Sequence, residues 1–546
     1  MPALTSPPRL LPGLLLAAVG GAALWSAFPG SVSAAGWWAA APLGVALLVV
    51  ASAGARARRG ALLGFVFGFV FLFPHLHWSG IYVGLLPWTA LAVVSAAFYG
   101  VYGAFLPRLL RSRLGLGPVA VAAGWVALEA ARARFPFGGF PWGKVAFSQA
   151  DAPTLGLAAL GGSAAVSFVT VLAGALLGWG LLALRRVPAP PDAARGAGRL
   201  RAFAVAAVLA VLVGAVGALV PRPSAAEDGT RRIAAVQGNV PEAGLEFNAE
   251  RRAVLDNHAN ATLELARAVR EGRAAQPDLV LWPENSSDID PLRNPDAAAV
   301  IEQATDAIDA PVLVGAVLEE PAPDLSNAGL VSLPGEGLSG ATVENLRRYV
   351  KHRPAPFGEF MPYRSFFRIF SDKVDLVRHD FVHGSGPSVV EMDGVRVGDV
   401  ICFEVAFDDL PVQAVRDGAE MIVVQTNNAT FGFSDEAVQQ LAMSRLRAVE
   451  TGRSVVQIST VGVSSIITPD GRATESSRLF TRAVLQGEVP LRTSTTWAVR
   501  LGSAPELGLC VLALVLVGTA RRGPRTGRRR GPAGPPVPAR QPEVVP

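Results

Sequence analysis

Long apolar runs fill most of the first 221 residues of the chain, and short polar connections separate them. Each run has about 18 residues or more, the length that a helix needs to cross a hydrocarbon core about 30 Å thick. One more run of this kind lies near the C-terminus. The pattern predicts eight membrane-spanning helices, at roughly 9–28, 36–54, 60–77, 83–107, 115–134, 158–184, 201–221 and 499–519.

The segment from about 230 to 492 has a different pattern, in which short β-branched runs alternate with amphipathic stretches. This alternation is typical of a folded α/β domain. Strands are expected within 232–240, 277–285, 311–318, 397–405, 421–428 and 454–467. Helices are expected at 249–271, 295–308, 407–417 and 434–451.

Composition and charge support a membrane protein. Hydrophobic residues make up 51% of the chain, charged residues 17%, and the mean hydropathy is +0.37. These values are too apolar for a soluble globular chain. The net charge of +5 comes from arginines beside apolar runs and in the C-terminal tail, so it indicates membrane topology and not a nucleic-acid partner.

Basic residues gather in alternate connections between the apolar runs, while the opposite connections, at 29–36 and 75–80, carry none. The loop at 132–144 is an exception. Since basic loops stay in the cytoplasm, both termini are expected there, with the α/β domain on the outer face. The basic residues of the alternate connections are Arg9, Arg56, Arg58, Arg59, Arg108, Arg111, Arg113, Arg185, Arg186, Arg195, Arg199 and Arg201.

Four regions follow from this pattern. Residues 1–222 are expected to form a membrane domain with seven spans, 223–497 an extracytoplasmic α/β domain, and 498–520 the eighth span. The Pro- and Arg-rich residues 521–546 are expected to be a disordered cytoplasmic tail. A cleaved signal peptide is an alternative for the first run, because SVSAA ends in small residues. Cleavage would leave the α/β domain on the same side.

The chain has two cysteines, Cys402 and Cys510, and Cys402 lies in the strand-like stretch DVICFEVAF. A buried cysteine in a strand is most often a small hydrophobe. An unpaired thiol on the outer face, however, is exposed to an oxidising compartment. The strand ends close to Cys402 and a helix follows, so the thiol is placed as a nucleophile would be, and the backbone N–H of Phe403 can donate to an oxyanion.

The thiol needs a base, and carboxylates are better candidates than the histidines of the domain, none of which follows a strand in a catalytic pattern. Glu284 follows a strand and a Trp-Pro pair, an apolar setting that raises the pKa of a carboxyl group. Lys351 follows another strand, where a fixed ammonium stabilises an oxyanion or lowers the thiol pKa. The histidines set aside are His258, His352, His379 and His383.

Strand-Glu, strand-Lys and strand-Cys in this order resemble the Glu-Lys-Cys triad of the nitrilase (carbon-nitrogen hydrolase) superfamily. The chain is most similar to its membrane branch, the apolipoprotein N-acyltransferases. The resemblance covers nearly the whole chain apart from the tail. It rests on WPE at 282–284, YVK at 349–351 followed by PFGE at 356–359, CFE at 402–404, and the stretch 125–149 that contains GFPW.

The resemblance implies an α-β-β-α sandwich on a base of eight membrane helices. It also implies acyl transfer from a membrane phospholipid, through a cysteine thioester, to the α-amino group of the diacylglyceryl-cysteine that begins an apolipoprotein. Glu284 is then the base, Cys402 the nucleophile, and Lys351 with the Phe403 amide holds the oxyanion. The protein is expected to be a monomer in the bacterial cytoplasmic membrane, without cofactor or metal.

Three further residues carry over from the resemblance. Glu359 and Glu404 are expected to orient Lys351 and to shape the thiol site, with a purely structural ion pair as the alternative, and Asn327 is expected in the pocket. The chain also departs from the family pattern, which puts the preferred acyl donor in doubt. It has Phe403 where Tyr is usual, Pro354 where Leu is common, and NNATFG at 427–432 where the family has NDAWFG.

Other interpretations predict different observations. A membrane-anchored amidase or nitrilase would use the same triad with water as acceptor. A scaffold with a relic domain would have a damaged triad, whereas all three residues are present. HLH at 75–77 offers at most two metal ligands. The aromatic stretch 360–374 is either a lid that enters the membrane interface or an ordinary core helix.

Overall fold

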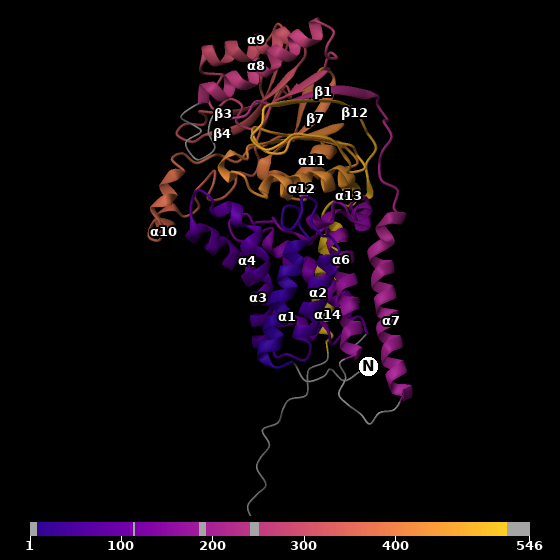
Figure 1. Ribbon diagram of the computed structural model, residues 1–546. Coiled ribbons are helices and arrows are strands. Elements are labelled where there is room, and N and C mark those ends of the chain that lie inside the picture. The colour runs from indigo at the N-terminus through magenta and orange to yellow at the C-terminus, as the bar shows by residue number, and fades with distance from the viewer. Residues whose placement is uncertain (1–7, 113–114, 185–192, 241–250, 521–546) are drawn as a thin grey trace, which may run out of the picture.

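The computed structural model describes residues 8–112, 115–184, 193–240 and 251–520. A helical bundle forms one half of the molecule and an α/β domain the other, stacked end to end (Figure 1). The predicted disordered tail at 521–546 lies outside the described residues, as do Arg113, Arg185 and Arg186.

Each predicted apolar run contains a helix. By length and composition, four helical segments are able to cross a membrane, namely 57–75, 85–109, 153–184 and 197–219, and three more apolar helices are shorter. The helix at 117–132 has 16 residues and belongs to neither group. The chain thus has several apolar helices, as a membrane protein requires. The eight helices are α1 (Leu10–Ser26), α2 (Ala40–Ser52), α3 (Ala57–His75), α4 (Leu85–Leu109), α5 (Gly117–Arg132), α6 (Ala158–Leu184), α7 (Ala193–Ala215) and α14 (Ala504–Gly518).

Glycines bring the helices of the bundle into backbone contact. A Cβ atom added at Gly60 of α3 would lie 2.2 Å from the carbonyl oxygen of Gly103 of α4, and one at Gly64 would lie 2.1 Å from that of Tyr99. Close approach of this kind gives van der Waals contact between helices in lipid, where no hydrophobic force drives them together. Large apolar side chains stay exposed on the outside, with Val211 70% and Leu514 72% exposed.

Two six-stranded sheets form the α/β domain. The first has the order β12-β1-β2-β3-β4-β5, and the second β11-β10-β9-β8-β7-β6. Parallel pairing joins β1 to β2, β2 to β3, β7 to β8 and β8 to β9, and the other pairs are antiparallel. The strands are β1 (Thr230–Gln237), β2 (Leu279–Leu281), β3 (Val312–Leu318), β4 (Ser326–Ser332), β5 (Arg348–Val350), β6 (Val389–Met392), β7 (Val395–Ile401), β8 (Met421–Thr426), β9 (Ser454–Ser459), β10 (Ser465–Ile467), β11 (Ala473–Ser476) and β12 (Ala483–Pro490).

Helices cover both sheets, as the α-β-β-α sandwich requires. The pair α8 (Arg251–Arg270) and α9 (Pro295–Ile308) lies on the outer side, and α11 (Asp409–Arg416) and α12 (Glu436–Thr451) lie between the sheets and the bundle (Figure 1). Buried aliphatic residues such as Leu281 and Ile401 fill the space between the sheets. This confirms the nitrilase-like α/β fold expected from the resemblance.

The hydrophobic core of the bundle continues into the domain. One buried cluster contains Phe67 and Trp125 of the membrane helices together with Phe403, and with Met443 and Leu446 of α12. The α/β domain is therefore packed onto its membrane base and is not tethered by a linker. The short helix α13 (Trp497–Leu501) leads from the last strand back into α14.

Candidate active site

Three strand ends bring Glu284, Lys351 and Cys402 to one edge of the sandwich. Glu284 follows β2, Lys351 follows β5 directly, and Cys402 follows β7 directly. The strand expected over 397–405 therefore ends at Ile401, one residue before the thiol. Residues Cys402–Ala406 form a 3₁₀ turn, η7, that leads to α11.

Lys351 lies between two carboxylates. Its Nζ atom is 2.9 Å from Glu284 Oε1 and 2.8 Å from Glu359 Oε1. Lys351 is 1% and Glu284 4% exposed, so solvent barely reaches the ion pair. Burial alone would lower the pKa of Lys351, but the charges of Glu284 and Glu359 outweigh it and raise that pKa well above its usual value. The lysine is therefore a fixed cation.

Hydrogen bonds fix the carboxylate of Glu284. The Nδ2 atom of Asn327, on β4, donates to Glu284 Oε1 at 2.7 Å and to Glu359 Oε1 at 2.9 Å. The backbone N–H of Asn427 donates to Glu284 Oε2 at 2.9 Å. Asn327 thus holds the two acids that flank Lys351.

Cys402 sits at a strained elbow. Its φ of 53° is in the left-handed region, which non-glycine residues adopt only where their surroundings enforce it. The Sγ atom accepts hydrogen bonds from Thr426 Oγ1 at 3.5 Å and Gln440 Nε2 at 3.8 Å. Burial, and then the charge of Glu284, raise the pKa of the thiol, while Lys351 acts in the opposite direction. The resting thiol is therefore neutral and needs a base to become a nucleophile.

Glu404 joins the nucleophile elbow to the segment that carries Lys351. Its Oε1 atom accepts the backbone N–H groups of His352 at 2.7 Å and Arg353 at 2.9 Å, and its Oε2 atom accepts that of Ile401 at 2.8 Å. The hydroxyl of Tyr349 donates to the same carboxylate at 3.0 Å. Glu404 therefore shapes the thiol site through the backbone and makes no direct ion pair with Lys351 in the described structure.

The structure has a polar network behind the thiol that the sequence analysis did not predict. Glu436, at the start of α12, accepts a hydrogen bond from Asn428 Nδ2 at 2.6 Å, and Gln440 Oε1 accepts one from Thr426 Oγ1 at 2.9 Å. Burial raises the pKa of Glu436 to about 8, and the charge of Glu284 acts in the same direction. Sequence reasoning missed Glu436 and Gln440, because neither follows a strand or lies in one of the motifs that carry the resemblance.

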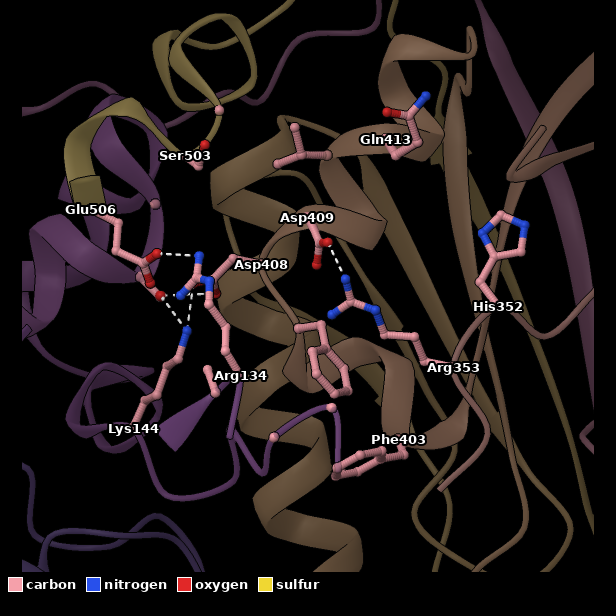
Figure 2. Close-up of a pocket in the computed structure, with 18 of the residues that line it drawn as sticks. Arg134, Lys144, His352, Arg353, Phe403, Asp408, Asp409, Gln413, Ser503 and Glu506 are labelled. Atoms are coloured by element: carbon pink, nitrogen blue, oxygen red, sulfur yellow. Dashed lines mark hydrogen bonds and ion pairs between the residues drawn. The ribbon is translucent and has the colours of Figure 1, made fainter. Parts of the chain in front are cut away.

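The side chain of Phe403 faces the membrane half. Its ring stacks on Phe140 and Trp142 of the GFPW loop, with ring centroids 5.8 Å and 6.5 Å apart. A cavity of about 560 Å³ lies along this seam (Figure 2). Phe403, Arg353 and Asp409 contribute to its wall, whereas Glu284, Lys351 and Cys402 do not.

The basic loop at 132–144, which departs from the charge pattern of the other connections, uses its charges inside the protein. Arg132 is buried and donates to the carbonyl oxygens of Phe140 and Trp142. Arg134 pairs with Glu506 of α14, and Lys144 pairs with Asp408. Three buried or paired cations carry no information about which side of the membrane the loop occupies.

The histidines of the domain do not approach the thiol. His258, His379 and His383 each hydrogen bond to a backbone carbonyl, and His352 packs on Tyr349. Among the described residues, no group of three or more His, Cys, Asp or Glu side chains is arranged to hold a metal ion. In the HLH stretch, His75 packs on Phe28 and His77 on Trp88, so the two rings lie against different partners.

The α/β domain is a nitrilase-like sandwich that carries Glu, Lys and Cys side chains at its edge, and it packs on apolar helices. These features define the class of protein, a carbon-nitrogen hydrolase domain on a membrane base. Family models described as apolipoprotein N-acyltransferase N-terminal domain and carbon-nitrogen hydrolase match residues 20–176 and 232–499. The chain belongs to the apolipoprotein N-acyltransferase family, as the resemblance predicted. It is thus an acyltransferase, and these matches do not favour the hydrolase alternative.

Two relatives match almost end to end. The apolipoprotein N-acyltransferase of Mycolicibacterium smegmatis is 41% identical over 94% of this chain and 87% of its own length. That of Azotobacter vinelandii is 31% identical over 96% of this chain and 97% of its own length. Among solved structures, an amidase of Nesterenkonia sp. aligns over 53% of this chain and 98% of its own, with 19% identity and a TM-score of 0.36.

Proposed function

We propose that this protein moves an acyl chain from a membrane phospholipid to the α-amino group of the diacylglyceryl-cysteine that begins an apolipoprotein. The observation that carries the proposal is the placement of Lys351 between Glu284 and Glu359, at the strand ends beside the Cys402 elbow. Both substrates are lipids, and a catalytic domain packed on apolar helices keeps its site at the membrane that holds them.

In the first step, Glu284 takes the thiol proton while Cys402 Sγ attacks the ester carbonyl carbon of the phospholipid. Glu284 Oε2 has a lone pair left for this proton, because only the Asn427 N–H is bonded to it in the described structure. Lys351 and the Phe403 N–H hold the negative charge on the carbonyl oxygen. The carbon–oxygen bond breaks, and the lysophospholipid leaves with the proton from Glu284.

In the second step, the amine of the lipoprotein attacks the carbonyl carbon of the thioester. Glu284 accepts a proton from that amine, the carbon–sulfur bond breaks, and the thiolate regains a proton. The same lysine and amide stabilise the second tetrahedral oxyanion. Because burial and the charge of Glu284 raise the pKa of the thiol, the attack by sulfur and the transfer of its proton to Glu284 are proposed to occur together.

For the topology, we infer eight membrane spans, both termini in the cytoplasm, and residues 223–497 on the extracytoplasmic face. Helices at all eight apolar runs and the basic residues in alternate connections support this arrangement. The shorter helices α1, α2, α5 and α14 have 17, 13, 16 and 15 residues, so flanking turns must complete their passage. The protein is proposed to act as a monomer in the bacterial cytoplasmic membrane.

The aromatic stretch 360–374 is proposed to contact the membrane surface. Its short helix, α10 (Arg364–Arg368), projects from the side of the domain toward the bundle (Figure 1). Phe366 is 55%, Ile369 76% and Phe370 63% exposed, which is the opposite of what a core helix shows. Exposed aromatic and aliphatic side chains among arginines suit the interface between water and lipid.

The test uses purified full-length protein in lipid nanodiscs. Incubation with phospholipid alone is expected to increase the mass of the protein by one acyl group. When a diacylated lipopeptide is added, the acyl group should leave the protein, and the mass of the lipopeptide should increase by the same amount. Cys402→Ala is expected to abolish both changes, while Cys510→Ser should leave both intact. Full activity of Cys402→Ala, or release of free fatty acid in place of acylated lipopeptide, would overturn the proposal.

A further inference from the structure

An ion pair crosses from the membrane half to the nucleophile elbow. Lys144 lies two residues after Trp142, which ends the GFPW motif, and its Nζ atom is 2.5 Å from Asp408 Oδ2 (Figure 2). Asp408 comes two residues after η7, the turn that begins with Cys402. Ser163, in the kinked first turn of α6, donates its hydroxyl to Asp408 Oδ1 at 2.8 Å. Two elements of the membrane half therefore hold one residue beside the elbow.

Arg447 of α12 connects the same carboxylate to the backbone of the elbow. Its Nη2 atom lies 2.9 Å from Asp408 Oδ1 and donates to the carbonyl oxygen of Ala406 at 3.0 Å, while Nε donates to that of Val405 at 2.8 Å. The third nitrogen, Nη1, lies 2.5 Å from Glu450 Oε2. The guanidinium thus holds the last two carbonyls of η7 in place.

Three members of the network are buried, and its charges balance. The side chains of Lys144, Arg447 and Glu450 are 3%, 1% and 3% exposed, whereas that of Asp408 is 31% exposed. Lys144 and Arg447 hold the pKa of Asp408 below its usual value, although burial acts in the opposite direction. Two cations thus face two carboxylates, and the loss of Lys144 removes the only ion pair in the described structure that joins the membrane half to Asp408.

The elbow needs such support because Cys402 has a backbone conformation that its neighbours must enforce. We infer that Lys144 and Arg447 are positioning residues, through which the membrane half sets the geometry of the Cys402 elbow. In the described structure, Cys402 Sγ hydrogen bonds to Thr426 and Gln440 and to neither of these side chains, so both act through Asp408 and the η7 carbonyls. The inference rests on the proposed role of Cys402 as nucleophile.

The experiment measures the single-turnover rate of acyl-thioester formation, by intact mass, in full-length protein with phospholipid and no acceptor. Lys144→Met is expected to slow this rate about 10- to 100-fold, the scale seen when a catalytic group is displaced by about 1 Å. Lys144→Arg, which keeps the charge, should recover most of the rate. Recovery of the rate by arginine indicates a positioning role. The thermal midpoint of each variant reports any loss of stability.

A matched control breaks another ion pair on the same seam. Arg445 of α12 lies 2.7 Å from Asp151 of the membrane half and bonds to the carbonyl of Gly471, away from the elbow. Asp151→Asn is therefore expected to form the thioester at the wild-type rate. An equal loss in this variant and in Lys144→Met would show that any damage to the seam matters, and it would overturn the specific role of Lys144.

The outcomes separate this inference from the proposed function. If the wild type forms no acyl-thioester, or if Cys402→Ala still forms one, the proposed function fails. If the wild type forms it and Lys144→Met forms it at the same rate, only the positioning role fails. Should Lys144→Met not fold, Arg447→Lys keeps the charge but loses the paired bonds to Val405 and Ala406, and an unchanged rate in that variant overturns the inference.

Discussion

The ammonium of Lys351 lies 2.9 Å from the carboxylate of Glu284, and both side chains are almost completely removed from solvent. Hydrogen bonds from Asn327 and from the backbone of Asn427 hold the same carboxylate, so the pair is fixed in position before any substrate arrives. In the proposed mechanism, the base and the oxyanion partner are therefore placed beforehand, and only the substrate carbonyl is missing.

Replacing Glu284 with Gln should prevent accumulation of the acyl-thioester. The amide keeps the shape of the side chain but accepts no proton, so the rate should fall by about 10² to 10⁴, the range for loss of a general base. Intact-mass measurement with phospholipid alone provides the rate. Glu488→Gln, at an exposed site on β12, serves as the control. A thioester that forms at the wild-type rate in Glu284→Gln would assign the base to another residue.

Asn327 should be sensitive to charge more than to size. Its amide donates to both Glu284 and Glu359, so Asn327→Asp places a third carboxylate against two others and should abolish thioester formation. Asn327→Ala removes the donor without adding charge, and should lower the free energy of unfolding by about 1–3 kcal/mol with partial loss of rate. Thermal unfolding and single-turnover assays compare them. Equal rates in the two variants would contradict the charge argument.

Glu436 should make stability depend on pH. Burial raises its pKa from 4.5 to about 8, so the folded protein binds a proton that the unfolded chain has already released in this range. The free energy of unfolding therefore decreases as pH rises from about 4.5 to about 8. Glu436→Gln removes this contribution, and the fall in thermal midpoint between pH 5.5 and 8.5 should be smaller than in the wild type. An identical fall in both proteins would count against the buried carboxyl.

Glu404 should contribute mainly to stability of the elbow. Its carboxylate accepts three backbone N–H groups and the Tyr349 hydroxyl, and an amide at this position turns one acceptor into a donor. Glu404→Gln should lower the free energy of unfolding by about 1–3 kcal/mol for the donor left unpaired. Glu391→Gln, at an exposed position of β6, should change nothing. Matching thermal midpoints for the two variants would refute this.

The aromatic stretch should report contact with lipid. Phe370 is 63% exposed, so a tryptophan at this position meets whatever the stretch touches. Fluorescence of Phe370→Trp, read as a difference from the wild type in nanodiscs, should be quenched by lipids brominated near the head group. A tryptophan at Gln303, exposed on α9 on the side of the domain away from the bundle (Figure 1), should not respond. Quenching only by an aqueous quencher would place the stretch in water.

The strands that carry the triad were predictable because the information is local. The short strands before Glu284, Lys351 and Cys402 each contain β-branched residues, and each ends within three residues of the side chain that it positions. The apolar runs predicted the helices for the same reason. The predicted boundaries of the helices were less accurate. The run at 36–54 contains a helix of only 13 residues, because the first residues of the run form turns.

The network behind the thiol was not predictable from local pattern. A helix that begins with Glu436 and carries Gln440 and Arg447 has the sequence of a solvated surface helix, yet all three side chains are buried. Their burial is produced by packing between the second sheet and the bundle, which periodicity does not encode. Lys144 and Asp408 are 264 residues apart in the chain, so no local signal connects them.

Helix α12 has thirteen of its sixteen residues buried, between the thiol on one side and the membrane half on the other. It contacts the GFPW loop directly, since Trp142 donates to Gln439 at 2.7 Å. A solubilising agent that loosens the bundle will therefore disturb the catalytic site while the sheets above remain folded. In purification, the rate of thioester formation is a stricter criterion for choosing a detergent than circular dichroism or a monodisperse elution profile.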